Sequence, residues 1–284
     1  MKLKLFKPLW GHIGSLQLAT KQAVENNFDG IEGSVPEDKS QREQFADSLA
    51  EHKLELIGEI FTGGNYVPDP SASPENHLDD IKRKLELTLP LNPIFINTQA
   101  GLDAWPLKTS IAFYEKVLAL AEEHETTISI ELHRSRITHS PWVTRDIIAE
   151  LPDLPLTIDF SHWCCVAERL IMNDEPELLQ NLAKQTHHIH ARVGYDQGPQ
   201  VPDPRAPEYE KEVTAHINWW KTIWAYLQTT QKTEFTTTPE FGTDGYLHLE
   251  PYTQRPVADL WEINCWMAEK VKSEWLEFWK SHNP

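Results

Sequence analysis

Short apolar runs alternate with amphipathic segments along the whole chain, and several of these runs end in a carboxylate or an imidazole. The runs predict strands at residues 3–9, 30–35, 54–61, 94–99, 127–133, 156–163, 187–193 and 233–241. The amphipathic segments between them predict helices at 15–26, 40–52, 74–89, 110–124, 143–151, 175–184, 208–229 and 256–280. Eight strand–helix units in succession favour a closed parallel (β/α)8 barrel, the TIM barrel, over an open doubly wound sheet.

No glycine- and serine-rich linker and no change of composition divides the chain. Residues 1–284 are therefore expected to form a single domain whose last helix lies at about 256–280. The longest irregular stretches, at 62–73, 134–141, 194–207 and 243–255, all follow predicted strands. Loops in such positions lie at the C-terminal face of a barrel, where active sites form. We expect the functional residues at that face.

Composition and charge limit the kinds of partner that can be expected for the protein. The formal net charge of −17 disfavours nucleic acid, because a negative surface repels phosphate backbones. No apolar stretch reaches the ~18 residues of a membrane-spanning helix, so no membrane contact is expected. Three cysteines do not make a disulfide framework, and we expect a reduced, cytoplasmic protein. Eleven tryptophans, seven of them in the last two predicted helices, fit either helix packing or a subunit interface.

Four strand ends carry residues that can bind a divalent metal ion. Glu131, Asp159 and Glu240 each follow a strand-like run, and His190 ends the segment His-Ile-His at 188–190. Each has another explanation when taken alone, since a strand-end carboxylate can form a salt bridge and Asp159 can cap the next helix. Together, three carboxylates and one imidazole suit Mn²⁺, Mg²⁺, Co²⁺ or Zn²⁺ and leave positions open for substrate.

Further imidazoles lie near the same strand ends. His188 and His190 share one face of a strand because side chains alternate along it, so one can be a ligand and the other a supporting group. His162 follows Asp159 by three residues, and both can point into one pocket. A pair of histidines on one strand face is more often functional than a single buried histidine.

These motifs resemble the xylose isomerase-like TIM barrel superfamily, which contains sugar isomerases, epimerases and AP endonucleases of the endonuclease IV type. The resemblance rests on Ile-Glu-Leu-His at 130–133, Asp-Phe-Ser-His at 159–162, His-Ile-His at 188–190 and Pro-Glu-Phe-Gly at 239–242. The segment Phe-Asp-Gly-Ile-Glu at 28–32 resembles the Gly-x-Glu signature of the second strand in that family. The resemblance covers essentially the whole chain in order.

The resemblance implies roles for individual residues. The residues expected to hold one divalent metal ion are Glu131, Asp159, His190 and Glu240. Proton transfer to and from substrate is implied for Glu131 and Glu240. The expected substrate contacts, which include candidates at other strand ends and in loops, are His162, His188, Arg192, His133, Arg205, Glu59 and Trp10. Arg192 shares the face of His190, and Arg205 lies in a proline-rich loop. If such arginines converge, they favour an acidic or phosphorylated substrate.

The expected activity is a metal-dependent isomerase or epimerase acting on a sugar, sugar phosphate or small hydroxy-carbonyl compound. Carboxylates would move a proton beside a carbonyl, while the metal ion stabilises the enediolate that forms. Two alternatives stay open: a metal-dependent phosphodiesterase or AP endonuclease-like hydrolase, and a barrel that binds a sugar without catalysis. Relatives are often dimers or tetramers, so a homo-oligomer is compatible with the sequence.

Overall fold

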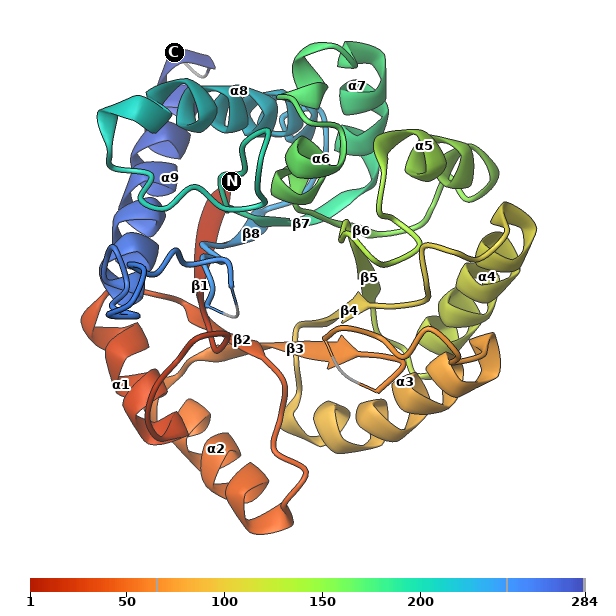
Figure 1. Cartoon of the computed structure of the whole chain (residues 1–284). Coiled ribbons are helices and arrows are strands. Elements are labelled where there is room, and N and C mark those ends of the chain that lie inside the picture. Colours follow the sequence, from red (N-terminus) through yellow and green to blue (C-terminus); the bar gives the residue numbers. More distant parts are fainter. Residues whose placement is uncertain (65, 244, 283–284) are drawn as a thin grey trace.

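Eight parallel strands pair in the order of the sequence, and the sheet closes because β1 (Lys2–Pro8) pairs with both β2 (Gly30–Gly33) and β8 (Glu234–Thr238). The computed structural model describes residues 1–282 except 65 and 244. Figure 1 looks into the barrel and shows the helices arranged around it. The predicted (β/α)8 TIM barrel is confirmed.

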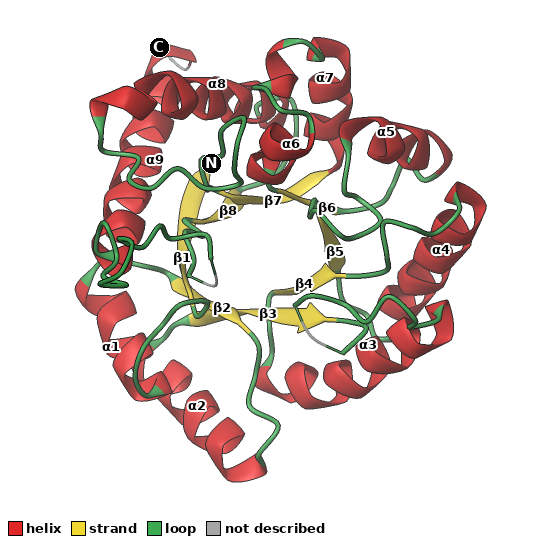
Figure 2. Cartoon of the chain, viewed as in Figure 1, coloured by secondary structure: helices red, strands yellow, loops and turns green. Residues whose placement is uncertain are grey.

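The other strands are β3 (Glu55–Phe61), β4 (Phe95–Gln99), β5 (Ile128–Glu131), β6 (Leu156–Ile158) and β7 (Thr186–His190). The α-helices are α1 (Leu16–Glu25), α2 (Lys39–His52), α3 (Pro74–Thr88), α4 (Leu107–Glu123), α5 (Pro141–Glu150), α6 (Phe160–Val166), α7 (Pro176–Gln185), α8 (Glu210–Leu227) and α9 (Leu260–His282). Short 3-10 helices lie at η1 (Leu89–Leu91), η2 (Ile171–Asn173) and η3 (Pro207–Tyr209). Figure 2 shows the strands inside the ring of helices.

Polar residues before the helices fix several helix starts. Ser15 accepts a hydrogen bond from the Leu18 amide at the start of α1. Ser73 and Asn76 form a reciprocal capping box at the start of α3, where Pro74 occupies the first turn. Such caps satisfy amides that have no partner inside the helix.

The two faces of the strands differ in character. Outward-facing residues such as Ile31, Ile60 and Ile130 are buried under the helices. Inside the barrel, Phe6, Ile57 and Phe95 form a small separate apolar cluster. Beyond this cluster, toward the C-terminal strand ends, the inward positions carry polar side chains. Thus the closed end of the barrel is apolar, and the site lies above it.

One predicted strand is wrong in extent. The sequence predicts an extended run over 156–163, but β6 ends at Ile158 and α6 occupies Phe160–Val166. Asp159 is the cause, because its carboxylate accepts a hydrogen bond from the Ser161 amide and so caps the helix. The apolar residues that follow resemble a continued strand, but they form the buried face of this short helix.

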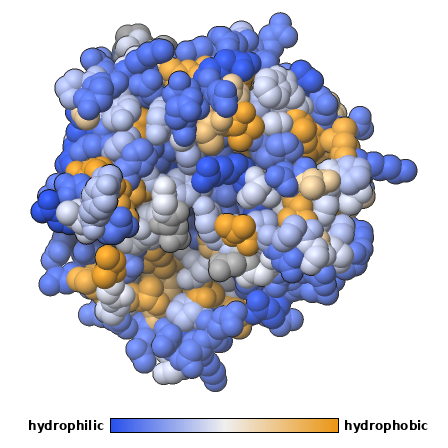
Figure 3. Space-filling view, viewed as in Figure 1, coloured by the Kyte–Doolittle hydropathy of each residue, from blue (hydrophilic) through white to orange (hydrophobic). Residues whose placement is uncertain are grey.

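Tryptophans of the last helices take part in helix packing. Trp219, Trp220 and Trp224 of α8 are buried, and the Trp224 ring lies 5.3 Å from the ring of Trp275 in α9. The face seen in Figure 3 is mostly hydrophilic, with separate apolar patches. Within the described residues, no helix combines the length and the apolar character needed to cross a membrane.

Candidate metal centre

Four side chains from neighbouring strand ends converge inside the mouth of the barrel. Glu131 ends β5, Asp159 follows β6, His190 ends β7 and Glu240 lies two residues beyond β8. Each offers a ligand atom, and these atoms all lie within 4.8 Å of one another. All four residues are buried. The structure therefore brings together the four residues that the sequence suggested as metal ligands.

Two amides of β4 hold the Glu131 carboxylate. Asn97 donates a hydrogen bond to Oε2 at 2.9 Å, and Gln99 donates to both oxygens at 3.1 and 3.2 Å. These amides alternate along one strand and so share its inward face. Although burial favours the neutral acid, the charges around Glu131, chiefly that of His190, lower its pKa. Glu131 is accordingly an ionised carboxylate in a fixed orientation.

The imidazole of His190 is oriented by a carboxylate behind it. Its Nε2 lies 3.0 Å from Oε1 of Glu32 and donates to that carboxylate. Burial lowers the pKa of His190, but Glu240, Glu32 and Glu131 outweigh it and raise the pKa well above its ordinary value, so a metal ion would have to replace the proton on Nδ1. Nδ1 lies 2.9 Å from Oε2 of Glu240, but without hydrogen-bond alignment, and it has no hydrogen-bond partner among the described residues. A metal-binding histidine typically has this arrangement, with a carboxylate on its other nitrogen.

His188 lies one layer below and holds the same carboxylate. Its Nε2 lies 3.2 Å from Oε2 of Glu32, and its Nδ1 lies 2.7 Å from the Thr236 hydroxyl. The Thr238 hydroxyl also donates to Glu32. Burial raises the pKa of Glu32, but His190 and His188 outweigh it and bring the pKa well below its usual range. His188 therefore supports the site from below, and the structure does not bring it to the cavity wall.

Asp159 is the most heavily engaged of the three carboxylates in the cluster. One oxygen accepts hydrogen bonds from the amide and hydroxyl of Ser161, and the other is paired with the guanidinium of Arg192. Arg192 is itself buried, and one of its nitrogens lies 2.6 Å from Nε2 of His162. The guanidinium thus ties Asp159 to His162 at the edge of the cluster.

Two glutamates, Glu240 of the cluster and Glu59 beside it, have raised pKa values. Burial, with the charge of Glu131, raises the pKa of Glu240 to about 7, although His190 opposes the shift. Burial and the neighbouring charges of Glu240 and Glu32 raise the pKa of Glu59 well above its ordinary value. Crowded carboxylates in a low-dielectric site hold protons in this way, and such groups cluster at functional sites.

A cavity of about 180 Å³ opens beside the cluster. Its walls are Trp10, Glu59, Phe61, Tyr66, Gln99, His133, Arg192 and Glu240. Trp10 and Glu59, expected as substrate contacts, both lie in this wall. Tyr246 closes the rim, since its ring lies 4.9 Å from the Trp10 ring and its hydroxyl accepts from Tyr66 at 3.1 Å. The cavity therefore combines aromatic walls with a polar floor.

A second histidine pair stands next to the cluster. Glu131, His133 and His162 also place ligand atoms within 4.8 Å of one another. Burial lowers the pKa of both imidazoles, that of His133 to about 3, and the positive charge of Arg192 adds to the effect. Positive guanidinium groups also disfavour a second cation here. Of the two imidazoles, His133 lines the cavity, whereas His162 is buried and is not part of its wall.

Arg205 does not reach the cavity. Its guanidinium pairs with Asp203 at 2.8 Å and with Glu262 at 3.3 Å, in a groove that Pro204 and residues of α8 and α9 also line. The Arg205 end of the proline-rich loop therefore lies away from the cavity, whereas Gln200 of the same loop is hydrogen-bonded to the main chain of Gly242. Conversely, sequence reasoning missed Asn97, Gln99, Tyr66 and Tyr246. Only the alternation of Asn97 and Gln99 before Glu131 could have signalled the two amides.

The chain belongs to the xylose isomerase-like TIM barrel family, whose sequence profile matches residues 20–203. Similar solved structures include a probable 3-DHS dehydratase from Bacillus anthracis (TM-score 0.62, 15% identity, 96% of this chain and 99% of that chain). Endonuclease IV from Thermus thermophilus (0.61, 13%, 98% and 100%) and a 3-keto-D-glucoside 4-epimerase from E. coli (0.58, 15%, 96% and 100%) are also similar. No curated protein matches the chain in sequence. At these identities the likeness shows a common fold.

Proposed function

We propose that the protein is a divalent-metal-dependent isomerase or epimerase that moves a proton beside the carbonyl of a sugar or a small hydroxy-carbonyl compound. One observation carries this proposal: the convergence of Glu131, Asp159, His190 and Glu240 beside a cavity of about 180 Å³. A buried imidazole nitrogen without a hydrogen bond, surrounded by carboxylates, fits a cation. The proposed ligands are these four residues.

The charges around the cluster support a cation. Five buried carboxylates lie in or next to it: Glu32, Glu59, Glu131, Asp159 and Glu240. Arg192 is the permanent positive charge that pairs with them. Crowding keeps a proton on Glu59 and, near neutral pH, partly on Glu240, and a divalent ion would replace such protons as the partner of the carboxylates. When bound, such an ion would stabilise the negative charge that develops on substrate oxygens.

Glu240 is the best placed group to exchange a proton. Without a metal ion the pKa of Glu240 is about 7. A bound cation would lower it and leave the carboxylate ionised to accept a proton from substrate, which suits a general base. Glu131, with its lowered pKa, stays ionised and is better suited to bind metal. Glu59 lies in the same cavity wall and holds its proton more strongly, so it can donate to a substrate oxygen.

The cavity wall suggests how a substrate is recognised. Trp10, Phe61 and Tyr66 offer aromatic faces, which suit the apolar C–H face of a sugar. Gln99 lies in the same wall, and its Oε1 has no hydrogen-bond partner among the described residues, so it can accept from a hydroxyl. Aromatic faces beside several polar and charged groups suit a small molecule that carries hydroxyl and carbonyl oxygens.

Two other reactions begin from a related site. Removal of a proton beside a carbonyl also starts a dehydration, the reaction named for the similar Bacillus anthracis protein. A phosphodiesterase activity, as in endonuclease IV, is less favoured, because positive guanidinium groups adjoin the second histidine group and the chain carries a net charge of −17. A barrel that binds a sugar without catalysis would bind metal and ligand but would exchange no carbon-bound proton.

Solvent deuterium exchange tests the proposal. The metal-free protein would be incubated in D₂O with Mn²⁺ and a panel of ketoses, aldoses, sugar acids and their phosphates. Deuterium at carbon in at least one compound, abolished by a chelator, is the expected result, and it detects isomerisation, epimerisation and dehydration alike. Exchange that persists without metal, or no exchange across the panel, would refute the proposal.

Matched variants separate proton transfer from metal binding. Glu240→Gln and Glu131→Gln are expected to lose exchange, whereas Glu234→Gln, at the other end of β8 and paired with Lys4, should keep it. Metal content is measured in parallel by equilibrium dialysis. Full exchange in Glu240→Gln at normal metal content would exclude Glu240 as the proton-transfer group.

A further inference from the structure

A lysine is buried outside the barrel without a carboxylate partner. Lys7 is 2% exposed and lies near the end of β1, next to Phe6, which points into the barrel. Side chains alternate along a strand, so Lys7 points outward into the helix layer. Its Nζ donates to the Pro8 carbonyl at 3.3 Å and lies 4.3 Å from the centre of the Trp261 ring. Among the described residues no carboxylate pairs with it, and burial lowers its pKa to about 8.

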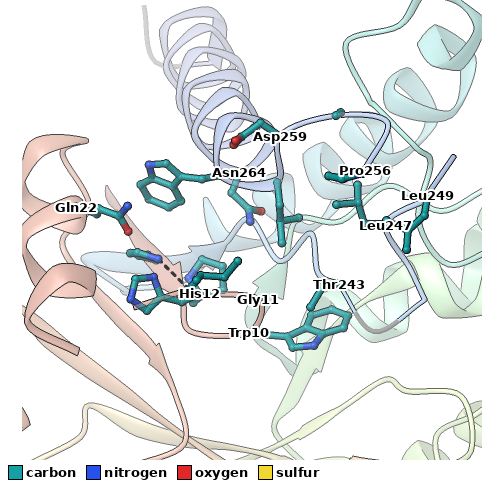
Figure 4. A pocket seen from close by; sticks show the side chains of 16 residues that line it. Trp10, Gly11, His12, Gln22, Thr243, Leu247, Leu249, Pro256, Asp259 and Asn264 are labelled. Carbon is teal, nitrogen blue, oxygen red and sulfur yellow. Dashed lines mark hydrogen bonds between the residues drawn. The ribbon is translucent and has the colours of Figure 1, made fainter. Parts of the chain in front are cut away.

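This lysine forms part of the wall of a cavity of about 600 Å³ between the end of β1, α1 and the start of α9. Figure 4 shows Gln22 of α1 on one side, and Leu247, Leu249 and Pro256 on the other. Ile13 and Leu249 at the rim are 90% and 47% exposed. The cavity thus offers one cation among mostly apolar walls.

Three other polar side chains of the cavity, those of Asn264, Asp259 and His12, already make hydrogen bonds. The Asn264 side chain makes two hydrogen bonds to the main chain of Phe241. Asp259 accepts from the Glu262 amide at the start of α9, and Nε2 of His12 lies 3.0 Å from the Ser15 carbonyl. Lys7 is therefore the buried cation of this cavity, and no carboxylate pairs with it among the described residues.

We propose that this cavity is a second binding site, which takes a small carboxylic acid with an apolar body. The carboxylate would pair with the ammonium of Lys7, and the apolar body would cover Leu247, Leu249 and Ile13. A single carboxylate matches a single ammonium. A phosphate dianion would carry excess negative charge beside Asp259 in a chain of net charge −17.

The site is distinct from the metal centre but shares one residue with it. Trp10 lines both cavities, and its ring is packed against Gly242, where an added Cβ would lie 2.1 Å from it. Because the tryptophan separates the two spaces, a test must show which cavity the acid occupies.

Calorimetry with matched probes tests this site on the whole protein. Phenylacetate combines a carboxylate with an apolar ring, phenylacetamide is its uncharged counterpart, and acetate lacks the ring. We expect phenylacetate to bind at least tenfold more tightly than either. Equal affinity for phenylacetamide, or no binding of phenylacetate, would overturn the proposal.

Two lysine variants locate the binding. Lys7→Met keeps an unbranched apolar side chain and is expected to weaken phenylacetate binding at least tenfold. Lys4→Met, on the same strand but paired with Glu55 and Glu234, should bind like the parent protein. Ile13→Asp, at the exposed rim, should weaken binding severalfold without touching the core. Unchanged affinity in both Lys7→Met and Ile13→Asp would show that the acid binds elsewhere.

Discussion

Replacing Lys7 by methionine should stabilise the protein at neutral pH. Burial lowers the pKa of Lys7 from 10.5 to about 8, and the weak opposing effect comes from Cys265. At about 1.4 kcal/mol for each pKa unit, this difference corresponds to a penalty of about 3 kcal/mol for the charged lysine in the fold. Loss of the contact with Trp261 and of the Pro8 hydrogen bond opposes the gain by about 1–2 kcal/mol. We expect a net stabilisation of about 1–2 kcal/mol at pH 7.

The sign of the pH dependence follows from proton binding. The lowered pKa means that the unfolded chain binds more protons than the folded one between pH 8 and 10.5. The penalty is therefore complete below about pH 8 and disappears as pH rises toward 10.5. The advantage of Lys7→Met must shrink across this interval. In the folded protein Cys265 stays protonated through most of this interval, because burial raises its pKa to about 11.

Urea unfolding followed by circular dichroism at pH 7 and pH 10 measures this difference. The unfolding free energies of variant and parent are compared at each pH, so the contributions of the other titrating groups, which both proteins share, cancel. Lys4→Met is the control: burial lowers the pKa of Lys4, but Glu234 and Glu55 outweigh it, and the net shift is upward. That variant should be destabilised at both pH values. A Lys7→Met protein that is less stable than the parent at pH 7, or whose advantage does not fall by pH 10, would refute the reasoning.

Two further predictions concern the supports of the site. Glu32→Gln should weaken Mn²⁺ binding about 10–100-fold, because the carboxylate that orients His190 is lost; calorimetry beside Glu55→Gln checks this, and an unchanged affinity would contradict it. Gly242→Ala should cost about 1–3 kcal/mol in unfolding free energy and displace Trp10, since the new Cβ meets the ring at 2.1 Å. Chemical denaturation measures the cost, and parent-like stability would show that the ring moves freely.

Most of the fold could be predicted because it depends on local pattern. Strand starts and helix spacing follow from apolar alternation and from caps such as Ser15 and Ser73. The end of β6 could not be predicted, because Ile158 and Phe160 belong to one continuous apolar run in the sequence. A single hydrogen bond from the Ser161 amide to Asp159 decides where the helix begins.

The residues of the candidate site also fall into those that the sequence predicts and those that it does not. Residues at strand ends, such as Glu131 and Glu240, are placed by the barrel itself, so their convergence could be expected. Residues in loops are placed by tertiary contacts that the sequence does not display. Arg205 is drawn to Asp203 and Glu262 on the surface, while Tyr66 and Tyr246 meet over the cavity from loops far apart in the chain.

The excess of buried carboxylates also predicts how metal should affect stability. A ligand that binds only the folded state at one hundred times its Kd stabilises that state by about 2.7 kcal/mol. For a chain of this size that amounts to a rise of about 5 °C in Tm. Because the four oxygen and nitrogen ligands come from four different strands, the unfolded chain cannot assemble them. Calorimetric scans with Mn²⁺ should show this rise, and KCl at equal ionic strength should not. If Glu240→Gln gains as much from Mn²⁺ as the parent, the ion binds somewhere other than the barrel mouth.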